Sequence, residues 1–276
     1  MINIFFNLLY HTQIKWYNEI GDIMSFINKN DIVIDLKIKK EYTLLHISDS
    51  HVIIANDHHA INNEEAWYKV KKDFAIHFNE PINSAHMIPS KDCFDKVMEY
   101  ALNVCPNALI LTGDIIDYYN EKNLNYVKNK LNDSKLKYLY SCGNHEEIID
   151  IIKEFDVIEF NEFKIISINN SQKKINKNTL ERLRKELNKP TILAMHIPLL
   201  SKHNKEEMKK YDEYFTMKYT DVENNDFFNL IEENSHIKAI LCGHVHGKGE
   251  SFVTPNIKQY CASSSLIGQV NLIKVK

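Results

Sequence analysis

The stretch Ala108–Asp117, "ALILTGDIID", decides the fold class of this chain, and other parts of the sequence repeat its pattern. Residues 108–112 are a short apolar run of the kind that forms a buried strand, and Gly113 lets the backbone turn sharply. Two carboxylates, Asp114 and Asp117, follow the turn. The stretch therefore predicts a buried strand that carries acidic side chains at its carboxyl end.

Four more apolar runs end in the same way. They are "YTLLHIS" (42–48), "LKYLYSC" (136–142), "TILAM" (191–195) and "IKAILC" (237–242). The residues that follow them are Asp49-Ser50-His51, Gly143-Asn144-His145-Glu146, His196, and Gly243-His244-Val245-His246. Open α/β sheets place their functional sites at the carboxyl ends of strands. Five such clusters indicate one shared site.

Amphipathic helical patterns lie between these runs. Apolar residues recur at helical spacing over 94–102, 124–131, 148–155, 180–187 and, less regularly, 222–231. Strands that alternate with helices predict an α/β sandwich with buried sheets. Segments 157–160 with 163–168, and 257–261 with 269–275, have the pattern of antiparallel hairpins, so we expect mixed sheets.

Length and composition indicate one domain over residues 1–276, because 44% hydrophobic content supports a large core and no linker divides the chain. We expect residues 1–41 to be an N-terminal extension that adds a strand or helix, and residues 52–90 to be a long insertion near the site.

The net charge of -3 disfavours nucleic acid and membrane surfaces as partners. The apolar N-terminus is too short for a membrane span. Five scattered cysteines favour reduced thiols and a cytoplasmic location.

The strand-end clusters contain a mixed set of metal-binding side chains: Asp49, His51, Asp114, Asn144, His196, His244 and His246. Oxygen and imidazole donors together suit Mn, Fe, Zn or Ni better than Mg or Ca. Seven ligands are too many for one ion with an open position, but they fit two ions that share a carboxylate. Such pairs of ions catalyse in-line displacement at phosphorus. They also neutralise a phosphate without arginine, and this chain has only Arg182 and Arg184. By itself, "CGHVHG" (242–247) leaves a metal site, a tight turn and core filling all open.

In this order, the motifs Asp-x-His, Gly-Asp-x-x-Asp, Gly-Asn-His-Glu, His and Gly-His-x-His resemble those of the calcineurin-like metallophosphoesterase family, from about Leu44 to the C-terminus. The resemblance implies a four-layer α/β/β/α sandwich with two mixed sheets flanked by helices. It implies one ion held by Asp49, His51 and His246, and a second by Asn144, His196 and His244, with Asp114 bridging both. It further implies that a hydroxide between the ions attacks phosphorus while His145, oriented by Asp114 or Asp117, assists the leaving group.

Two departures narrow the expected function. Tyr118-Tyr119 stand where protein serine/threonine phosphatases of the family carry Arg-Gly, and His51 and Asp117 stand where purple acid phosphatases have Gly and Tyr. We therefore expect a two-metal hydrolase of a phosphodiester or small phosphorylated metabolite. The alternatives are a nuclease that uses the same site and a catalytically weak, metal-stabilised interaction module. His145 favours catalysis, because a purely structural metal site does not need it. The substrate, the native metals and the oligomeric state stay open.

Several of these side chains also have a possible role in the fold alone. Asp117 caps a helix or contacts the site, Glu146 complements a helix dipole, and His46, Cys142 and Cys242 pack in the core. The insertion carries His58, His59, Trp67, Tyr68, His77 and His86. Segment 199–219 carries Tyr211, Tyr214, Phe215 and Tyr219, whose rings either stack on a nucleobase or pack the loop down.

Overall fold

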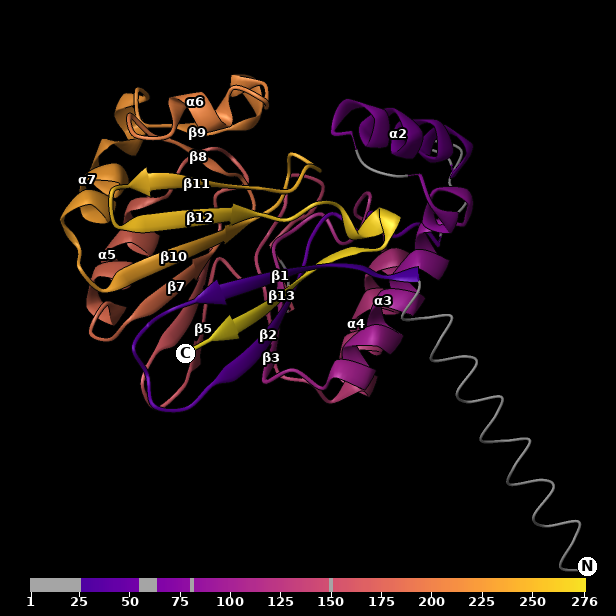
Figure 1. Ribbon diagram of the computed structural model, residues 1–276, viewed down its shortest axis with the longest axis horizontal. Helices are drawn as coiled ribbons and strands as arrows, with labels where there is room; N and C mark the ends of the chain where they lie inside the picture. Colours follow the sequence, from indigo (N-terminus) through magenta and orange to yellow (C-terminus); the bar gives the residue numbers. More distant parts are fainter. Residues whose placement is uncertain (1–25, 55–63, 80–81, 149–150) are drawn as a thin grey trace, which may run out of the picture.

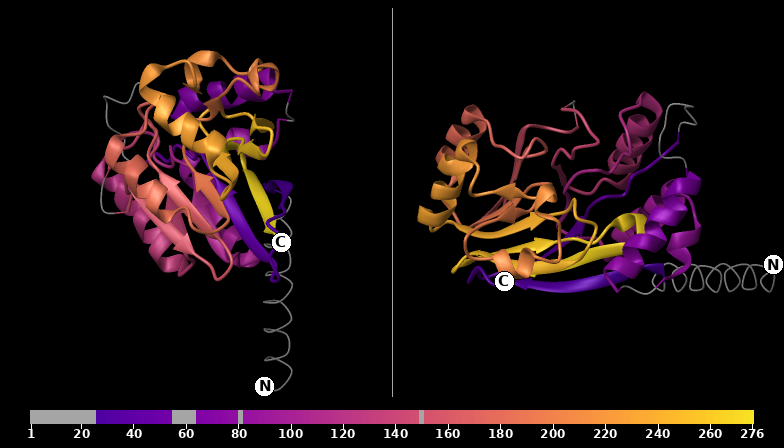
Figure 2. Two further views of the ribbon diagram at one scale, coloured as in Figure 1. Left: turned by 90° about the vertical axis from the view of Figure 1, so that its left-hand side faces the viewer. Right: turned by 90° about the horizontal axis from the view of Figure 1, so that it is seen from above.

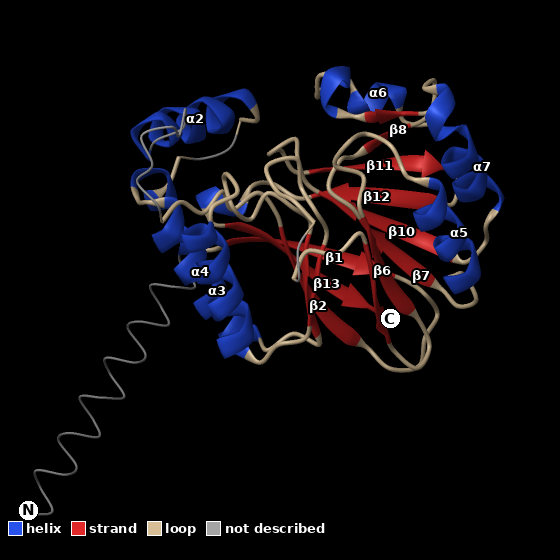
Figure 3. Ribbon diagram, turned by 180° about the vertical axis from the view of Figure 1, so that it is seen from behind, coloured by secondary structure: helices blue, strands red, loops and turns tan. Residues whose placement is uncertain are grey.

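The computed structural model describes residues 26–54, 64–79, 82–148 and 151–276. Its strands form two large sheets that face one another, and helices cover the outer face of each (Figures 1 and 3). The view from above separates the two groups of helices on opposite sides of the strands (Figure 2). The predicted four-layer α/β/β/α sandwich with mixed sheets is therefore confirmed.

The first sheet has five strands in the order β1-β13-β2-β3-β4. Their bounds are β1 Asn28–Ile34, β2 Tyr42–Ile47, β3 Ala108–Leu111, β4 Tyr138–Tyr140 and β13 Gln269–Val275. Strands β2, β3 and β4 run parallel, and β13 is antiparallel to β2 and parallel to β1. The carboxyl ends of β2, β3 and β4 therefore meet at one edge.

The second sheet has six strands in the order β11-β12-β10-β7-β6-β5. Their bounds are β5 Phe155–Glu159, β6 Lys164–Ile168, β7 Thr191–Ala194, β10 Ile237–Cys242, β11 Gly249–Thr254 and β12 Ile257–Cys261. Strands β6, β7, β10 and β12 are parallel, and the two edge strands are antiparallel to their neighbours. The hairpin predicted from 157–160 and 163–168 is confirmed as β5 and β6.

Helices and short elements connect the strands. They are α2 Glu64–His77, η1 Ser84–Met87, α3 Ser90–Val104, α4 Glu121–Ser134, α5 Lys177–Glu186, α6 Lys205–Met208, η2 Glu213–Phe215, η3 Val222–Asn224, α7 Asn225–Glu233 and η4 Ser265–Ile267, with a small pair of strands, β8 Leu199–Leu200 and β9 Met217–Lys218. Local signals set the ends of α4, where the Asn120 side chain accepts a hydrogen bond from the Lys122 amide and Lys135 adopts the left-handed conformation.

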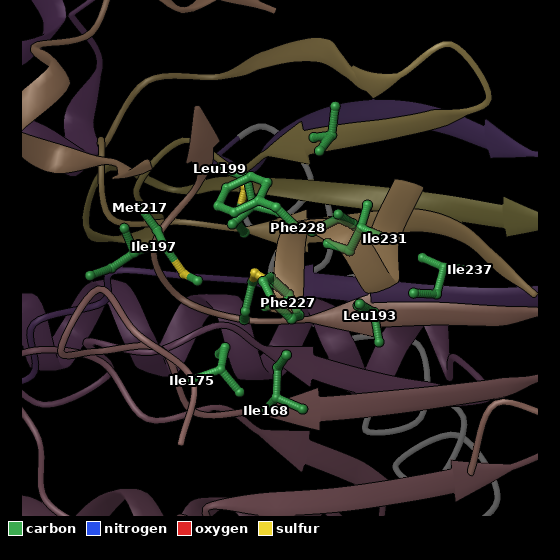
Figure 4. Close-up of a cluster of buried hydrophobic side chains, with 14 of the residues drawn as sticks. Ile168, Ile175, Leu193, Ile197, Leu199, Met217, Phe227, Phe228, Ile231 and Ile237 are labelled. Atoms are coloured by element: carbon green, nitrogen blue, oxygen red, sulfur yellow. The ribbon is translucent and has the colours of Figure 1, made fainter. Parts of the chain in front are cut away.

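Alternation along the strands divides the apolar residues among three cores, because successive side chains point to opposite faces of a sheet. In β10, Ala239 and Leu241 pack between the sheets, whereas Ile240 and Cys242 pack under the helices of the second sheet. Figure 4 shows this second core, in which Leu193 of β7 lies near Phe227 and Ile231 of α7. A third core lies between α3, α4 and the first sheet.

The helix predicted over 148–155 is wrong. Residues 151–154 form turns and isolated bridges, and β5 begins at Phe155. Ile152 packs in the core under α3 and α4, whereas Phe155 packs in the core under α5 and α7. The spacing of these residues therefore serves two different cores, and it does not define one face of a helix.

The predicted hairpin between 257–261 and 269–275 is also wrong. Strand β12 pairs with β10 and β11 in the second sheet, whereas β13 pairs with β1 and β2 in the first. The connection between them is tied to the end of β2, because the Ser264 and Ser265 hydroxyls donate to the carbonyl oxygens of Asp49 and Ser48. These hydrogen bonds hold the connection against the first sheet, so the chain passes from the second sheet to the first.

Parts of the predicted N-terminal extension and insertion lie outside the described residues, including residues 1–25 and His58 and His59. Residues 28–34 of the extension form β1, and residues 64–77 of the insertion form α2. Among the described residues, no helix is both long enough and apolar enough to span a bilayer.

The core between the sheets makes one quantitative prediction. Leu241 is fully buried there, so Leu241→Ala deletes packed atoms and leaves a cavity. We expect the variant to lose about 2–5 kcal/mol of unfolding free energy. Urea denaturation followed by circular dichroism measures the change. A loss smaller than 0.5 kcal/mol, as expected of surface substitutions, would contradict this position for the side chain.

Candidate metal centre

The two sheets bring all five strand-end clusters to one place. Strands β2, β3 and β4 deliver three clusters from the first sheet, and β7 and β10 deliver two from the second. Backbone hydrogen bonds tie the clusters together: the Asp49 amide donates to the Gly113 carbonyl oxygen, and the Gly243 amide donates to that of His196. The seven predicted donor residues therefore surround one region between the sheet ends.

The backbone of this region is held in an unusual conformation. Five of the donor residues have positive φ angles: Asp49 (54°), His51 (45°), Asp114 (51°), His244 (69°) and His246 (53°). The left-handed conformation costs an L-residue about 1–2 kcal/mol. Such strain accumulates at functional sites, where surrounding structure holds it in place. Here it turns successive side chains away from the strand direction and toward each other.

Gly243 shows how closely the clusters approach. A Cβ atom at this position would overlap the Ser48 hydroxyl and lie 2.5 Å from Asp49 Oδ2. The His244 amide, next in the chain, donates to both carboxylate oxygens of Asp49, at 3.1 and 3.0 Å. Only glycine at residue 243 therefore lets the β10 loop lie against the end of β2.

Asp49, His51 and His246 form the first group of donors. The Nε2 atoms of His51 and His246 lie 3.1 Å apart, and His246 Nε2 lies 3.4 Å from Asp49 Oδ1. The Nδ1 atom of His51 lies 3.1 Å from the Asp117 carboxylate, which is also buried. A hydrogen bond there leaves the Nε2 lone pair of His51 directed at the other two donors.

Asp114, Asn144, His196 and His244 form the second group. His196 Nε2 lies 3.1 Å from Asp114 Oδ2, 2.9 Å from Asn144 Oδ1 and 3.0 Å from His244 Nδ1. The other nitrogen of His196, Nδ1, donates to the Thr112 carbonyl oxygen at 2.7 Å. That bond fixes the tautomer of a neutral His196, so its Nε2 lone pair faces the three other donors.

Both groups have the chemistry of a cation site. In each, nitrogen and oxygen donor atoms meet at about 3 Å, which is unfavourable unless a proton or a metal cation lies between them. The pKa values respond to this arrangement. Burial raises the pKa of Asp49, but the charge and hydrogen bond of His246, together with the charge of His196, outweigh burial and bring it to about 2. Burial lowers the pKa of His196, but the Asp114 carboxylate raises it to about 9. A proton on His196 thus occupies the place of a cation.

His145 lies beside the second group without belonging to it. Its amide donates to Asp114 Oδ1 at 2.9 Å, and its Nδ1 donates to the Asp117 carbonyl oxygen at 2.6 Å. Burial lowers its pKa, but the nearby charges of Asp114 and Asp117 raise it above the ordinary histidine value. The Nε2 atom of His145 is left for a substrate.

Asp117 thus contacts the site. It caps no helix, because α4 begins at Glu121 and its capping residue is Asn120.

Glu146 supports the metal centre by linking two of its loops, a role that the sequence did not indicate. We call this arrangement the brace. Glu146 lies at no helix end, so the dipole reading is wrong. Its carboxylate accepts hydrogen bonds from the amides of Ile115, Ile116 and Gly143 and from the Tyr140 hydroxyl, at 2.5–3.2 Å. Burial, together with the charge of Asp114, raises its pKa to about 7. One side chain thereby joins the loops after β3 and β4.

The three residues expected in the core are there. His46 is fully buried between Thr112 and Asn271, with ring nitrogen contacts of 2.8 and 3.0 Å, and burial lowers its pKa to about 3. Cys142 and Cys242 are buried in separate apolar cores. None of these side chains forms part of the donor groups.

A pocket of about 600 Å³ opens over the centre. The floor consists of Asp114, Asn144, His145, His244, Val245 and His246, and the walls consist of Phe74, His77 and Phe78 on one side and Lys209, Lys210, Tyr211, Asp212 and Phe215 on the other. The sequence singled out His77, Tyr211 and Phe215. It missed Phe74, Phe78 and the two lysines, because no local pattern reveals which distant strand end a loop will cover.

A known sequence family matches the part of the chain that carries this centre. The family described as calcineurin-like phosphoesterase matches residues 42–248, from β2 to just beyond His246. The chain belongs to this family, so the resemblance expected from the motifs is confirmed. Membership makes it a metal-dependent phosphoric ester hydrolase and implies a centre of two divalent metal ions.

Individual relatives are distant. A protein of Moraxella catarrhalis (strain BBH18) named "Probable cyclic nucleotide phosphodiesterase" is 24% identical over 201 residues, which are 62% of this chain and 68% of the relative. Among solved structures, a dimetal phosphatase from Danio rerio is similar with a TM-score of 0.54 and 11% identity, over 82% of this chain and 88% of that chain. At 11% identity, the similarity to the Danio rerio structure shows a shared fold only.

The brace formed by Glu146 can be tested by substitution. Glu146→Ala leaves three buried amides and a hydroxyl without their acceptor. Because each unpaired buried group costs about 1–3 kcal/mol, we expect the variant to lose about 3 kcal/mol or more of unfolding free energy. Glu146→Gln keeps one acceptor oxygen and should lose less. The exposed neighbour Glu147, changed to alanine, is the control. Equal urea midpoints for Glu146→Ala and Glu147→Ala would contradict the brace.

Proposed function

We propose that this chain is a two-metal-ion phosphoesterase that hydrolyses a phosphodiester or another small phosphorylated metabolite. The observation that carries the proposal is that His145 lines the same pocket floor as donors from both groups. A metal site that only stabilises a fold needs neither an open pocket nor a half-buried histidine beside it. This combination favours catalysis over a metal-stabilised interaction module.

In this proposal Asp49, His51 and His246 hold one ion. Asn144, His196 and His244 hold the other, and Asp114 is shared. The convergence of nitrogen and oxygen donor atoms at about 3 Å supports these assignments. The mixture of donors favours Mn, Fe, Zn or Ni. When bound, the two ions neutralise the phosphoryl charge and lower the pKa of the attacking water.

The protein's own groups then position the leaving group and supply its proton. Asp114 and Asp117 hold His145 through its amide and its Nδ1 atom, which leaves Nε2 for the substrate. The same carboxylates favour the imidazolium form. As the phosphorus–oxygen bond breaks, His145 gives its Nε2 proton to the departing oxygen, which leaves as a neutral alcohol. A positioned acid of this kind contributes about 10²–10⁴ in rate.

The shape of the pocket supports a small substrate. Walls from α2 on one side and from the segment after α6 on the other enclose the floor. A cavity of about 600 Å³ matches a small molecule, whereas a nucleic acid duplex needs an open, basic groove. The name of the Moraxella catarrhalis relative is consistent with a phosphodiester.

Activity measurements test this mechanism directly. We expect the protein with Mn²⁺ to hydrolyse bis(4-nitrophenyl) phosphate. His145→Ala should lower kcat about 10²-fold or more, because the leaving group loses its acid. Asp114→Asn should abolish turnover, because both donor groups and His145 lose a charge. His203→Ala, a histidine paired with Glu232 outside the pocket lining, is the control. Circular dichroism checks the folds. Full activity after exhaustive chelation would refute the proposal.

The pKa of His196 predicts how metal binding depends on pH. Without metal its pKa is about 9, so at pH 7 the ring carries a proton that a metal ion must displace. Apparent Mn²⁺ affinity should therefore fall as pH falls below about 9, by up to about tenfold per pH unit. Calorimetric titrations at several pH values, in buffers of different ionisation enthalpy, measure both the affinity and the released proton. Affinity that stays constant from pH 6.5 to 9 would exclude His196 as a ligand.

A further inference from the structure

The outer part of the pocket is aromatic. Phe74 lies on α2 and Phe78 directly follows it, while Tyr211 and Phe215 come from the segment after α6. We call these four residues the aromatic wall. Figures 1 and 3 show α2 and α6 on opposite sides above the strand ends, so the wall brings together two segments that are far apart in the sequence.

Two rings of the wall lie next to the two histidines of the β10 loop. The ring centroid of Phe74 is 4.7 Å from that of His246, and the centroid of Phe215 is 5.6 Å from that of His244. In the proposed function these histidines bind different ions. A group attached to the phosphorus atom between the ions would therefore enter a space with a phenyl ring beside each metal site.

A buried lysine holds the α2 side of the aromatic wall in place. Lys71, one turn before Phe74, is buried, and its ammonium donates to the carbonyl oxygens of Ile88 at 2.7 Å and Ala85 at 3.3 Å. These bonds attach α2 to the residues that precede α3. Because these bonds anchor α2, Phe74 is held over the metal centre without a ligand.

The two segments also contact each other. The rings of Phe78 and Tyr211 are 6.0 Å apart, and the Tyr211 hydroxyl donates to the Gly247 carbonyl oxygen at 2.9 Å. A side chain at residue 247 would run into Phe78, since a Cβ atom there would lie 2.5 Å from its ring. Gly247 therefore lets the wall close against the loop that carries His244 and His246.

The two lysines at the rim have partners within the protein. Lys209 forms an ion pair with Glu206 at 2.6 Å, and Lys210 donates to the Lys248 carbonyl oxygen at 3.1 Å. Both arginines lie on α5, outside the lining. The described lining thus offers no arginine clamp for a second phosphate group, and its outer part favours an apolar portion of the ligand.

We propose that the aromatic wall binds a planar aromatic group of the substrate, such as a nucleobase or an aryl group, attached to the phosphate held by the metal centre. The inference rests on the proposed function and specifies its substrate class. Ring faces stack on any planar aromatic group, so the wall selects a flat ring without reading hydrogen-bonding groups. Phe74 and Phe215 determine this specificity and take no part in bond breaking.

Phosphonates test the inference because their phosphorus–carbon bond is not hydrolysed. Binding of methylphosphonate, cyclohexylphosphonate and phenylphosphonate to the Mn²⁺-loaded protein is measured by calorimetry. We expect phenylphosphonate to bind about tenfold more tightly than methylphosphonate, a factor within the range that stacking on one ring gives. Cyclohexylphosphonate should fall between them. Equal affinities for phenyl- and methylphosphonate would overturn the proposal, and equal affinities for phenyl- and cyclohexylphosphonate would overturn its planar requirement.

Matched variants assign the effect to the wall. Phe74→Ala and Phe215→Ala should each reduce the phenyl-to-methyl affinity ratio about threefold or more, whereas Phe74→Trp should retain the ratio. Phe252→Ala is the control, because Phe252 is as exposed as Phe215, at 44%, and lies outside the pocket lining. A ratio that survives both alanine substitutions would overturn the assignment.

The two proposals fail in different ways. If no ester is hydrolysed but the phenyl preference is present and lost in Phe74→Ala, the proposed function is wrong and the ligand class stands. If esters are hydrolysed with no preference for a ring, the inference about the wall is wrong and the proposed function stands.

Discussion

The structure depends on one electrostatic constraint: nitrogen and oxygen donor atoms crowd together where two sheets meet. His51 and His246 approach to 3.1 Å through Nε2 atoms, and His196 meets three acceptors at 2.9–3.1 Å. Unless a proton or a bound cation lies between them, their electron pairs repel. A bound cation or a trapped proton removes the repulsion, which is why the pKa of His196 rises to about 9. The fold must hold the donors together against their own repulsion, and several features exist for that purpose.

Those features combine local strain with rigid support. Five donor residues have left-handed backbones, and the residue types at these positions, Asp and His, are among those that tolerate this conformation best. Glu146 then joins two of the loops through four hydrogen bonds, and Ser264 and Ser265 hold the end of β2. Strain of this size persists because buried strands on both sides leave the loops little freedom. Support outside the metal-binding residues is thus as necessary as the residues themselves.

The strands and the convergence of the donor residues could be predicted because both have local signals. A short apolar run defines a strand such as β10, and Asp, Asn or His at the turn after a strand marks its functional end. Contacts between distant segments have no such signal. Residues 257–261 and 269–275 look like a hairpin, yet Ser264 and Ser265 tie the connection to β2 and take the chain to the other sheet. Ile152 and Phe155 have helical spacing, but they enter different cores. Phe74 meets His246 across 172 residues of sequence, which no local pattern encodes.

The scarcity of arginine and the aromatic wall follow from the same arrangement. A pocket that neutralises phosphate with side chains must line its walls with cations, which keeps them hydrated. In the proposed function the donors gather at the floor, where two bound ions would supply positive charge, so the walls can carry aromatic rings as well as lysines. Aromatic rings in turn lower the local dielectric constant, which would strengthen the attraction between the ions and the phosphate and the pull of Asp114 and Asp117 on His145. The metal centre therefore makes an aromatic pocket feasible, and the aromatic pocket makes the metal centre more effective.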